Sequence, residues 1–252
     1  MRIAISGSAC QGKTTLIKDF LEQWPSYTTP EKTYRDIIKE NDLDHSSETN
    51  KNTQENILDF MIKEQKKYRK SDNVIFDRCP LDNLVYSMWA TEQSELDIDE
   101  EFVKSCISKV RDSFDNLDII FFTPISKVAP VELTEDDLRD TDINVIEEVD
   151  NIFKAMHREY MTNDASVFFV KDNKPAIIEV FGDRRQRIQI LKLYIDAEGD
   201  IHPGGDLIDE DMLSDMKALS GVWKDVDPTE HSHLRKAMEE QIKKDPSHRM
   251  NK

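Results

Sequence analysis

The chain has 252 residues, enough for one α/β domain with an appendage or for two small domains. Its formal net charge of −17 repels nucleic acid and anionic membranes at long range, so we expect neither general nucleic-acid binding nor a membrane partner. The sequence contains no stretch approaching the roughly 18 to 20 apolar residues of a membrane helix. It enters an apolar strand at once, so we expect no signal peptide, and three cysteines without a paired framework lead us to expect a cytoplasmic protein.

Apolar runs of strand length alternate with segments of helical periodicity. We expect strands at residues 2–6, 73–77, 118–123 and 166–170, with another short extended piece at 177–181. We expect helices from 13 to 23, around 34–38, and at 53–70, 81–90, 102–114, 143–160 and 184–194, with Thr53 capping the third. This alternation predicts an α/β fold with a parallel sheet covered on both faces.

The composition changes near Asp196. Glycines and a proline follow, and then acidic and polar stretches without the pattern of a sheet. We therefore divide the chain into a domain at residues 1–195 and an acidic, partly ordered C-terminal appendage at residues 196–252.

A phosphate-binding loop lies between the first strand and the first helix. The pattern G-x-x-x-x-G-K-[ST] requires glycines that curl the backbone amides toward phosphate, a lysine for the β and γ phosphates and a hydroxyl for magnesium. The loop makes the fold a P-loop NTPase with three αβα layers and predicts ATP and Mg²⁺ as cofactors. The nucleotide-binding residues are Gly7, Ser8, Ala9, Cys10, Gln11, Gly12, Lys13, Thr14 and Thr15, with Thr14 as a magnesium ligand.

An acid and an arginine follow the strand at 73–77. Ligands of open α/β sheets bind beyond the carboxyl ends of the strands, where Asp77 and Arg78 stand. A carboxylate there can accept the proton of an attacking hydroxyl or hold magnesium through water, and the arginine can pair with substrate phosphate. The alternative is a structural ion pair at the strand end.

A third candidate is Arg139, in the acidic segment at residues 124–142. Phosphoryl transfer needs positive charge on the γ-phosphate, commonly from a closing lid. Lys127 is the other basic residue of this segment, so Arg139 is the candidate catalytic arginine. The alternative is an arginine that neutralises the acidic residues beside it.

Together these motifs resemble the small-molecule kinases among P-loop proteins. The loop, the TPE-x-x-x-R segment, the Asp-Arg dipeptide and the D-x-R lid are similar to the AAA-type ATPase/kinase domain of bifunctional NAD-biosynthesis regulators, which phosphorylates nicotinamide riboside. Thymidylate and deoxynucleoside kinases share the plan. The resemblance covers residues 1–195.

The resemblance implies roles for further residues. Asp77 would be the general base or the acid that organises the metal, and Arg78 a contact to phosphate or substrate. Glu31 and Arg35 would face the phosphate acceptor, and Gln65 lies where nucleoside kinases read the acceptor base, although an exposed helix glutamine is the plainer interpretation. Arg184 would stack beside the adenine, unless its turn only connects a strand to a helix.

The functional hypothesis is an ATP-dependent phosphotransferase for a hydroxyl or phosphate of a nucleoside, nucleotide or related small molecule. Lys13, Asp77, Arg78 and Arg139 would be its catalytic residues. One alternative is a nucleotide-dependent regulatory ATPase that engages a partner through the tail. Another is a kinase of hydroxylated bases in DNA, which the net charge disfavours. A homodimer is left open.

Overall fold

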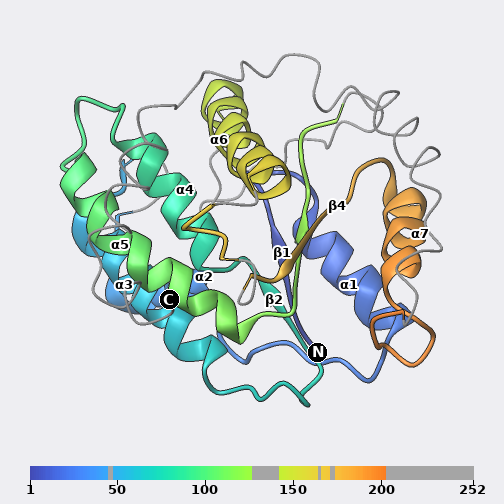
Figure 1. The fold of residues 1–252 in the computed structure, drawn as a ribbon. Coiled ribbons are helices and arrows are strands. Elements are labelled where there is room, and N and C mark those ends of the chain that lie inside the picture. Colours follow the sequence, from blue (N-terminus) through green and yellow to red (C-terminus); the bar gives the residue numbers. More distant parts are fainter. Residues whose placement is uncertain (45–47, 127–141, 164–165, 171–173, 203–252) are drawn as a thin grey trace.

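The computed structural model describes residues 1–44, 48–126, 142–163, 166–170 and 174–202 (Figure 1). Arg139, the predicted lid around it and the appendage beyond residue 202 lie outside the described residues. Among the residues described, no helix is both long enough and apolar enough to cross a membrane.

Four parallel strands form the sheet, in the spatial order β2-β1-β3-β4. Their bounds are Arg2–Ser6 for β1, Val74–Asp77 for β2, Ile119–Phe122 for β3 and Ala176–Glu179 for β4. The first and third are buried throughout, as expected for parallel strands covered on both faces. The chain runs from β1 to β2 on one side and then crosses to β3 and β4 on the other side of β1. The strand order therefore reverses at the carboxyl end of β1, which is the switch point where α/β sheets bind ligands.

Helices cover both faces of this sheet (Figure 1). They are α1 (Lys13–Gln23), α2 (Tyr34–Asn41), α3 (Lys51–Gln65), α4 (Pro80–Ala90), α5 (Glu100–Ser113), α6 (Ile143–Thr162) and α7 (Arg184–Tyr194). Ile3 and Ile5 of β1 pack with α1 and α7, whereas Ala4 faces the core shared by α3, α4, α5 and α6. This division into two cores by strand alternation confirms the three-layer αβα architecture.

Two predictions from the sequence were wrong. Residues 166–170 do not form a strand: Phe168 and Phe169 are buried because they pack as rings around Phe114, at centroid distances of 5.4 and 5.6 Å. The fourth strand is β4 instead. Helix α3 is capped by Asn50, whose side chain accepts a hydrogen bond from the backbone N–H of Thr53, so Thr53 lies inside the helix.

The chain continues against the domain after α7. The indole of Trp24 donates to the carbonyl of Asp196 at 2.6 Å, and the hydroxyl of Tyr27 donates to the carbonyl of Gly199 at the same distance. Ile195 and Ile201 form an antiparallel bridge. Residues 196–202 therefore pack near the end of α1, and the division of the chain at Asp196 stays a prediction.

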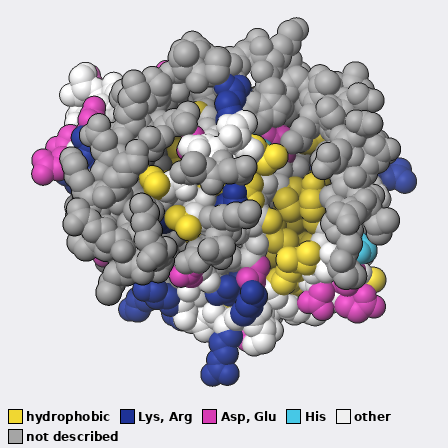
Figure 2. Space-filling model, in the orientation of Figure 1, with side chains coloured by type: hydrophobic (Ala, Val, Ile, Leu, Met, Phe, Trp, Pro, Cys, Tyr) yellow, Lys and Arg dark blue, Asp and Glu magenta, His cyan; other side chains and the backbone are white. Residues whose placement is uncertain are grey.

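Many of the charged side chains visible in Figure 2 lie toward its margin, and a few lie further in. Lysine and arginine are interspersed there with aspartate and glutamate, and hydrophobic side chains gather further in. On this face, the described residues show no continuous basic stripe of the kind that tracks a nucleic-acid backbone.

Candidate active site

The phosphate loop connects β1 to α1 at the switch point of the sheet. Gly7 has a φ of 137° and Gly12 a φ of 69°, both in the region that favours glycine. A Cβ atom at Gly7 would lie 2.7 Å from the backbone oxygen of Thr123, so the loop also needs glycine for its close approach to the end of β3. Helix α1 begins at Lys13 and directs its N-terminal N–H groups at this loop, as an anion site requires.

Lys13 is held inside the loop by backbone oxygens. Its Nζ donates to the carbonyl of Gly7 at 2.9 Å and to that of Ser8, and the residue is 6% exposed. Burial, together with the positive charge of Arg78, lowers the pKa of Lys13 to about 7, although Asp77 and Asp82 act in the opposite direction. A bound phosphate would add negative charge beside the amine and favour its charged form.

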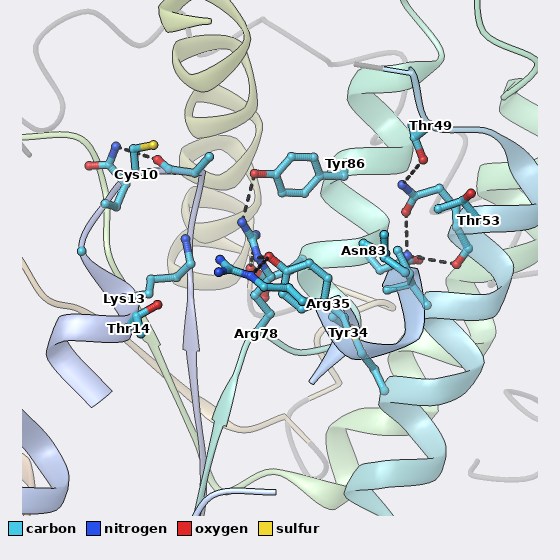
Figure 3. A pocket seen from close by; sticks show the side chains of 18 of the residues that line it. Cys10, Lys13, Thr14, Tyr34, Arg35, Thr49, Thr53, Arg78, Asn83 and Tyr86 are labelled. Atoms are coloured by element: carbon cyan, nitrogen blue, oxygen red, sulfur yellow. Dashed lines mark hydrogen bonds and ion pairs between the residues drawn. The ribbon is translucent and has the colours of Figure 1, made fainter. Parts of the chain in front are cut away.

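A cavity of about 130 Å³ opens from the phosphate loop toward α2, α3 and α4 (Figure 3). Lys13 and Thr14 lie at its phosphate end, and Tyr34, Arg35 and Arg78 stand next to them. Asp82 also lines the cavity, and the other wall residues are apolar or uncharged: Ile38, Ile57, Met61, Thr49, Thr53, Gln54, Asn83 and Tyr86. The cavity thus extends from the phosphate loop into a chamber with mainly uncharged walls.

Arg78 lies between these two parts. Its backbone is left-handed, with a φ of 72°, which is uncommon for a residue other than glycine. Its Nη1 donates to the carbonyl of Gly7 at 3.0 Å, its Nη2 to the hydroxyl of Tyr86 at 3.2 Å and its Nε to the hydroxyl of Tyr34 at 3.3 Å. The guanidinium carbon is within 5.4 Å of both ring centroids. The side chain is therefore fixed in place before any ligand arrives.

Asp82, in the first turn of α4, was not predicted from the sequence. Its buried carboxylate accepts hydrogen bonds from Ser6 Oγ at 2.8 Å, Cys79 N at 3.0 Å, Gly7 N at 3.2 Å and Arg78 Nη1 at 3.1 Å. Pro80 as first residue and an acid two residues later mark a helix start in DRCPLD, a signal that could have located it.

The predicted acceptor residues are distributed unequally. Arg35 lines the main cavity, and its Nε donates to the hydroxyl of Tyr34. Asp77 and Gln65 line a second cavity of about 180 Å³, which shares Thr14, Tyr34 and Arg78 with the main one. Glu31 is exposed and lines neither cavity, so the structure does not bring it together with the others.

Gln65 is buried, at 1% exposed, rather than an exposed helix glutamine. Neither its Oε1 nor its Nε2 has a hydrogen-bond partner among the described residues. A buried amide without partners costs free energy, so a ligand or water in the second cavity would stabilise it.

An amide network closes the far end of the main cavity (Figure 3). Asn83 Nδ2 donates to the backbone carbonyl of Gln54 at 3.0 Å and to its Oε1 at 2.6 Å. Gln54 Nε2 in turn donates to Thr49 Oγ1 at 2.8 Å. The backbone carbonyl can only accept, which fixes the orientation of the Asn83 amide. Asn83 Oδ1 and Thr53 Oγ1 are buried and have no partner among the described residues.

Arg187 of α7 also contacts the phosphate loop. Its Nη1 donates to the carbonyl of Gln11 at 2.6 Å and its Nε to that of Gly182 at 2.9 Å, and burial lowers its pKa. Arg184, the residue predicted at the adenine, is exposed and pairs with Asp19 at 3.0 Å. Helical spacing places Arg187 one turn after Arg184, and the sequence alone did not distinguish them.

The predicted magnesium ligands fit a nucleotide-bound metal. Thr14 and Asp77 line the same second cavity, and both supply the hard oxygen donors that Mg²⁺ prefers. The described residues contain no group of three or more acidic, histidine or cysteine side chains that could hold a metal. Two protein oxygens fit the usual arrangement, in which phosphates and waters complete the shell of Mg²⁺.

Comparisons with known proteins bear on the family and on the fold. No curated protein sequence matches the chain. The crystal structure of NadR protein in complex with NR is 14% identical, with a TM-score of 0.51, and the match covers 80% of this chain and 50% of that one. A deoxyadenosine kinase structure from M. mycoides is 16% identical, with a TM-score of 0.49, over 76% of this chain and 96% of that one.

The NadR likeness confirms, at the level of fold, the resemblance predicted from the sequence; this chain spans half of that protein. A family described as "AAA domain" matches residues 2–172, which is more than half of the chain and includes the phosphate loop, Asp77, Arg78 and Asp82. The chain therefore belongs to this AAA domain family of P-loop proteins.

Proposed function

We propose that this protein transfers the γ-phosphoryl group of ATP, with magnesium, to a hydroxyl of a nucleoside-like small molecule. The observation that carries the proposal is the continuous cavity between the phosphate loop and the uncharged amide end, with Arg78 fixed at the junction. Hydrolysis of ATP alone needs no second chamber. A kinase needs one, because the acceptor must lie in line with the γ-phosphate.

The donor side follows from the loop. Backbone amides and the N-terminus of α1 would hold the phosphates, and Lys13 would move from the Gly7 carbonyl onto them. Bound Mg²⁺ would supply charge neutralisation across the phosphates, held by Thr14 and, through water, by Asp77. Arg184 is proposed beside the adenine, as the resemblance implies.

The acceptor side suits an uncharged ring. Apolar side chains and the Tyr34 and Tyr86 rings form the walls, and the amides of Gln54 and Asn83 offer neutral hydrogen bonds. A neutral heterocycle matches such a chamber better than a second charged group does, because burying a charge without a partner is costly. Likeness in fold to a protein solved in complex with NR supports a nucleoside-like acceptor, but not the neutrality of its ring.

Asp77 is proposed as the general base for the acceptor hydroxyl. It stands at the carboxyl end of β2 beside Arg78, and it lines the second cavity, which shares Thr14, Tyr34 and Arg78 with the main one. Arg35 would orient the acceptor or bind transferred phosphate, and Arg139 would bring a further positive charge. Glu31 and Gln65 are proposed acceptor contacts, Glu31 after a movement of its exposed segment. We propose a cytoplasmic location.

The test is an acceptor screen with γ-labelled ATP and purified protein. Labelled nucleoside monophosphate is expected with at least one nucleoside, and Asp77→Asn should reduce its formation about 100-fold or more, the usual contribution of a general base. Asp59→Asn is the matched control, since Asp59 is an exposed helix residue that pairs with Lys109. If the protein hydrolysed ATP steadily but no acceptor in the screen became labelled, the result would support a regulatory ATPase and refute the proposal.

A further inference from the structure

Arg78 has few donors left for a substrate. Both N–H groups of its Nη1 are directed at the Gly7 carbonyl and the Asp82 carboxylate, its Nε at Tyr34 and one N–H of its Nη2 at Tyr86. One of the five guanidinium N–H groups therefore remains. Arg78 is 8% exposed, so it can offer a substrate one directed N–H donor and a positive charge, but not a bidentate hydrogen bond to phosphate.

The direction of that donor depends on Asp82. The same carboxylate oxygen, Oδ1, accepts from Arg78 Nη1 and from the N–H of Gly7, the first residue of the phosphate loop. Its other oxygen accepts from Ser6 at the end of β1 and from Cys79. Asp82 is 1% exposed, so these bonds are shielded from water and geometrically specific.

We propose that Asp82 is a positioning residue for phosphoryl transfer. It holds the Arg78 guanidinium in a fixed position relative to the start of the phosphate loop. The guanidinium then keeps a constant distance and direction to the γ-phosphate of bound ATP. Without this carboxylate, the two tyrosine partners and the bond from Nη1 to the Gly7 carbonyl would still hold the side chain near the site, but the buried ion pair that directs the guanidinium would be lost. The kinetic part of this inference rests on the proposed kinase function.

A purely structural role is the competing explanation. Asp82 completes a capping box at the start of α4 by accepting from the backbone N–H of Cys79. Asparagine can accept that same bond, so Asp82→Asn keeps the cap while it removes the anion that pairs with Arg78. The two roles can therefore be separated by one substitution.

The experiment is a double-mutant cycle in kcat, using the acceptor found in the screen. Asp82→Asn should lower kcat about 100-fold and change the KM for ATP less than threefold, because a misplacement of about 1 Å costs roughly that factor. In an Arg78→Met background the same substitution should cost less than threefold, since the group that it positions is gone. Equal losses in both backgrounds would refute the proposal.

Tyr86→Phe gives a variant that leaves the cap intact. It removes the partner of Arg78 Nη2, and kcat should fall about fivefold to tenfold in the same direction. Asp118→Asn is the matched control, because Asp118 pairs with Arg2 at 3.1 Å at the opposite end of the sheet. If Asp118→Asn lowered kcat as strongly, the effect of Asp82→Asn would be one of stability, and the proposal would fail.

A spectroscopic measurement does not depend on transfer. The Arg78 Nε–H resonance of ¹⁵N-labelled protein should be sharp in the wild type and in Asp118→Asn, and broadened in Asp82→Asn. A chain without kinase activity that shows this pattern would refute the proposed function and leave the positioning role standing. A resonance that stays sharp in Asp82→Asn would refute the positioning role alone.

Discussion

Lys13 makes nucleotide binding depend on pH. In the free protein its pKa is about 7, because it is buried among carbonyl oxygens and lies near Arg78. Phosphate oxygens favour the charged amine, so the pKa rises when ATP binds. Binding then takes up a proton, and affinity must fall as the pH rises through the pKa of the free protein.

The size of the effect follows from that pKa. Lys13 is neutral in about half of the free molecules at pH 7 and in about nine-tenths at pH 8. If the nucleotide binds the charged form, the apparent Kd for MgATP rises about fivefold from pH 7 to pH 8 and about tenfold for the next unit. The phosphates themselves ionise at roughly pH 6 and do not contribute in this window.

Isothermal titration calorimetry in two buffers of different ionisation enthalpy would measure both quantities. Proton uptake should be about one half at pH 7 and about nine-tenths at pH 8. Lys13→Arg is the control, since its guanidinium stays charged and its affinity should not vary between pH 7 and 9. A wild-type affinity that is constant over this range would show that Lys13 is already charged in the free protein.

Three further predictions concern the loop and its support. Gly7→Ala should weaken MgATP binding about tenfold or more, measured by calorimetry, because the added Cβ meets the Thr123 oxygen and the backbone is strained; unchanged binding would mean that the loop relaxes freely. Phe20→Ala should lower the free energy of unfolding in urea by about 3–5 kcal/mol, since this ring is fully buried; a loss below about 1 kcal/mol would contradict the packing. Arg187→Met should weaken MgATP binding about tenfold by releasing the phosphate loop; an equal loss in Arg184→Met would place a nucleotide contact at Arg184 as well.

The fold was predictable because its signals are local. Apolar runs of strand length and amphipathic helices each depend on neighbouring residues, and the parallel sheet follows from their alternation. The prediction of a strand at residues 166–170 was wrong because Phe168 and Phe169 are buried by aromatic packing on Phe114, which is distant in sequence. Burial alone does not distinguish a strand from a packed loop.

The site was predictable where a motif fixes it and not where the fold assembles it. The phosphate loop and Arg78 lie where the sequence indicated. The amide network of Gln54 and Asn83 comes from two helices whose packing brings the side chains together, and no spacing in the sequence records that. Asp82 was missed although the helix start in DRCPLD marks it. Arg187 was missed because helical periodicity predicts which residues share a face of the helix, but not which of two arginines points toward the protein interior.

The contacts of Trp24 and Tyr27 set a limit on where this protein can be shortened. Both side chains are buried at the end of α1, and each donates its polar hydrogen to the backbone after α7. A chain cut at residue 195 would leave an indole N–H and a phenol O–H without acceptors beside the helix that carries Lys13. A truncation meant to isolate the catalytic domain should therefore keep the chain to residue 202.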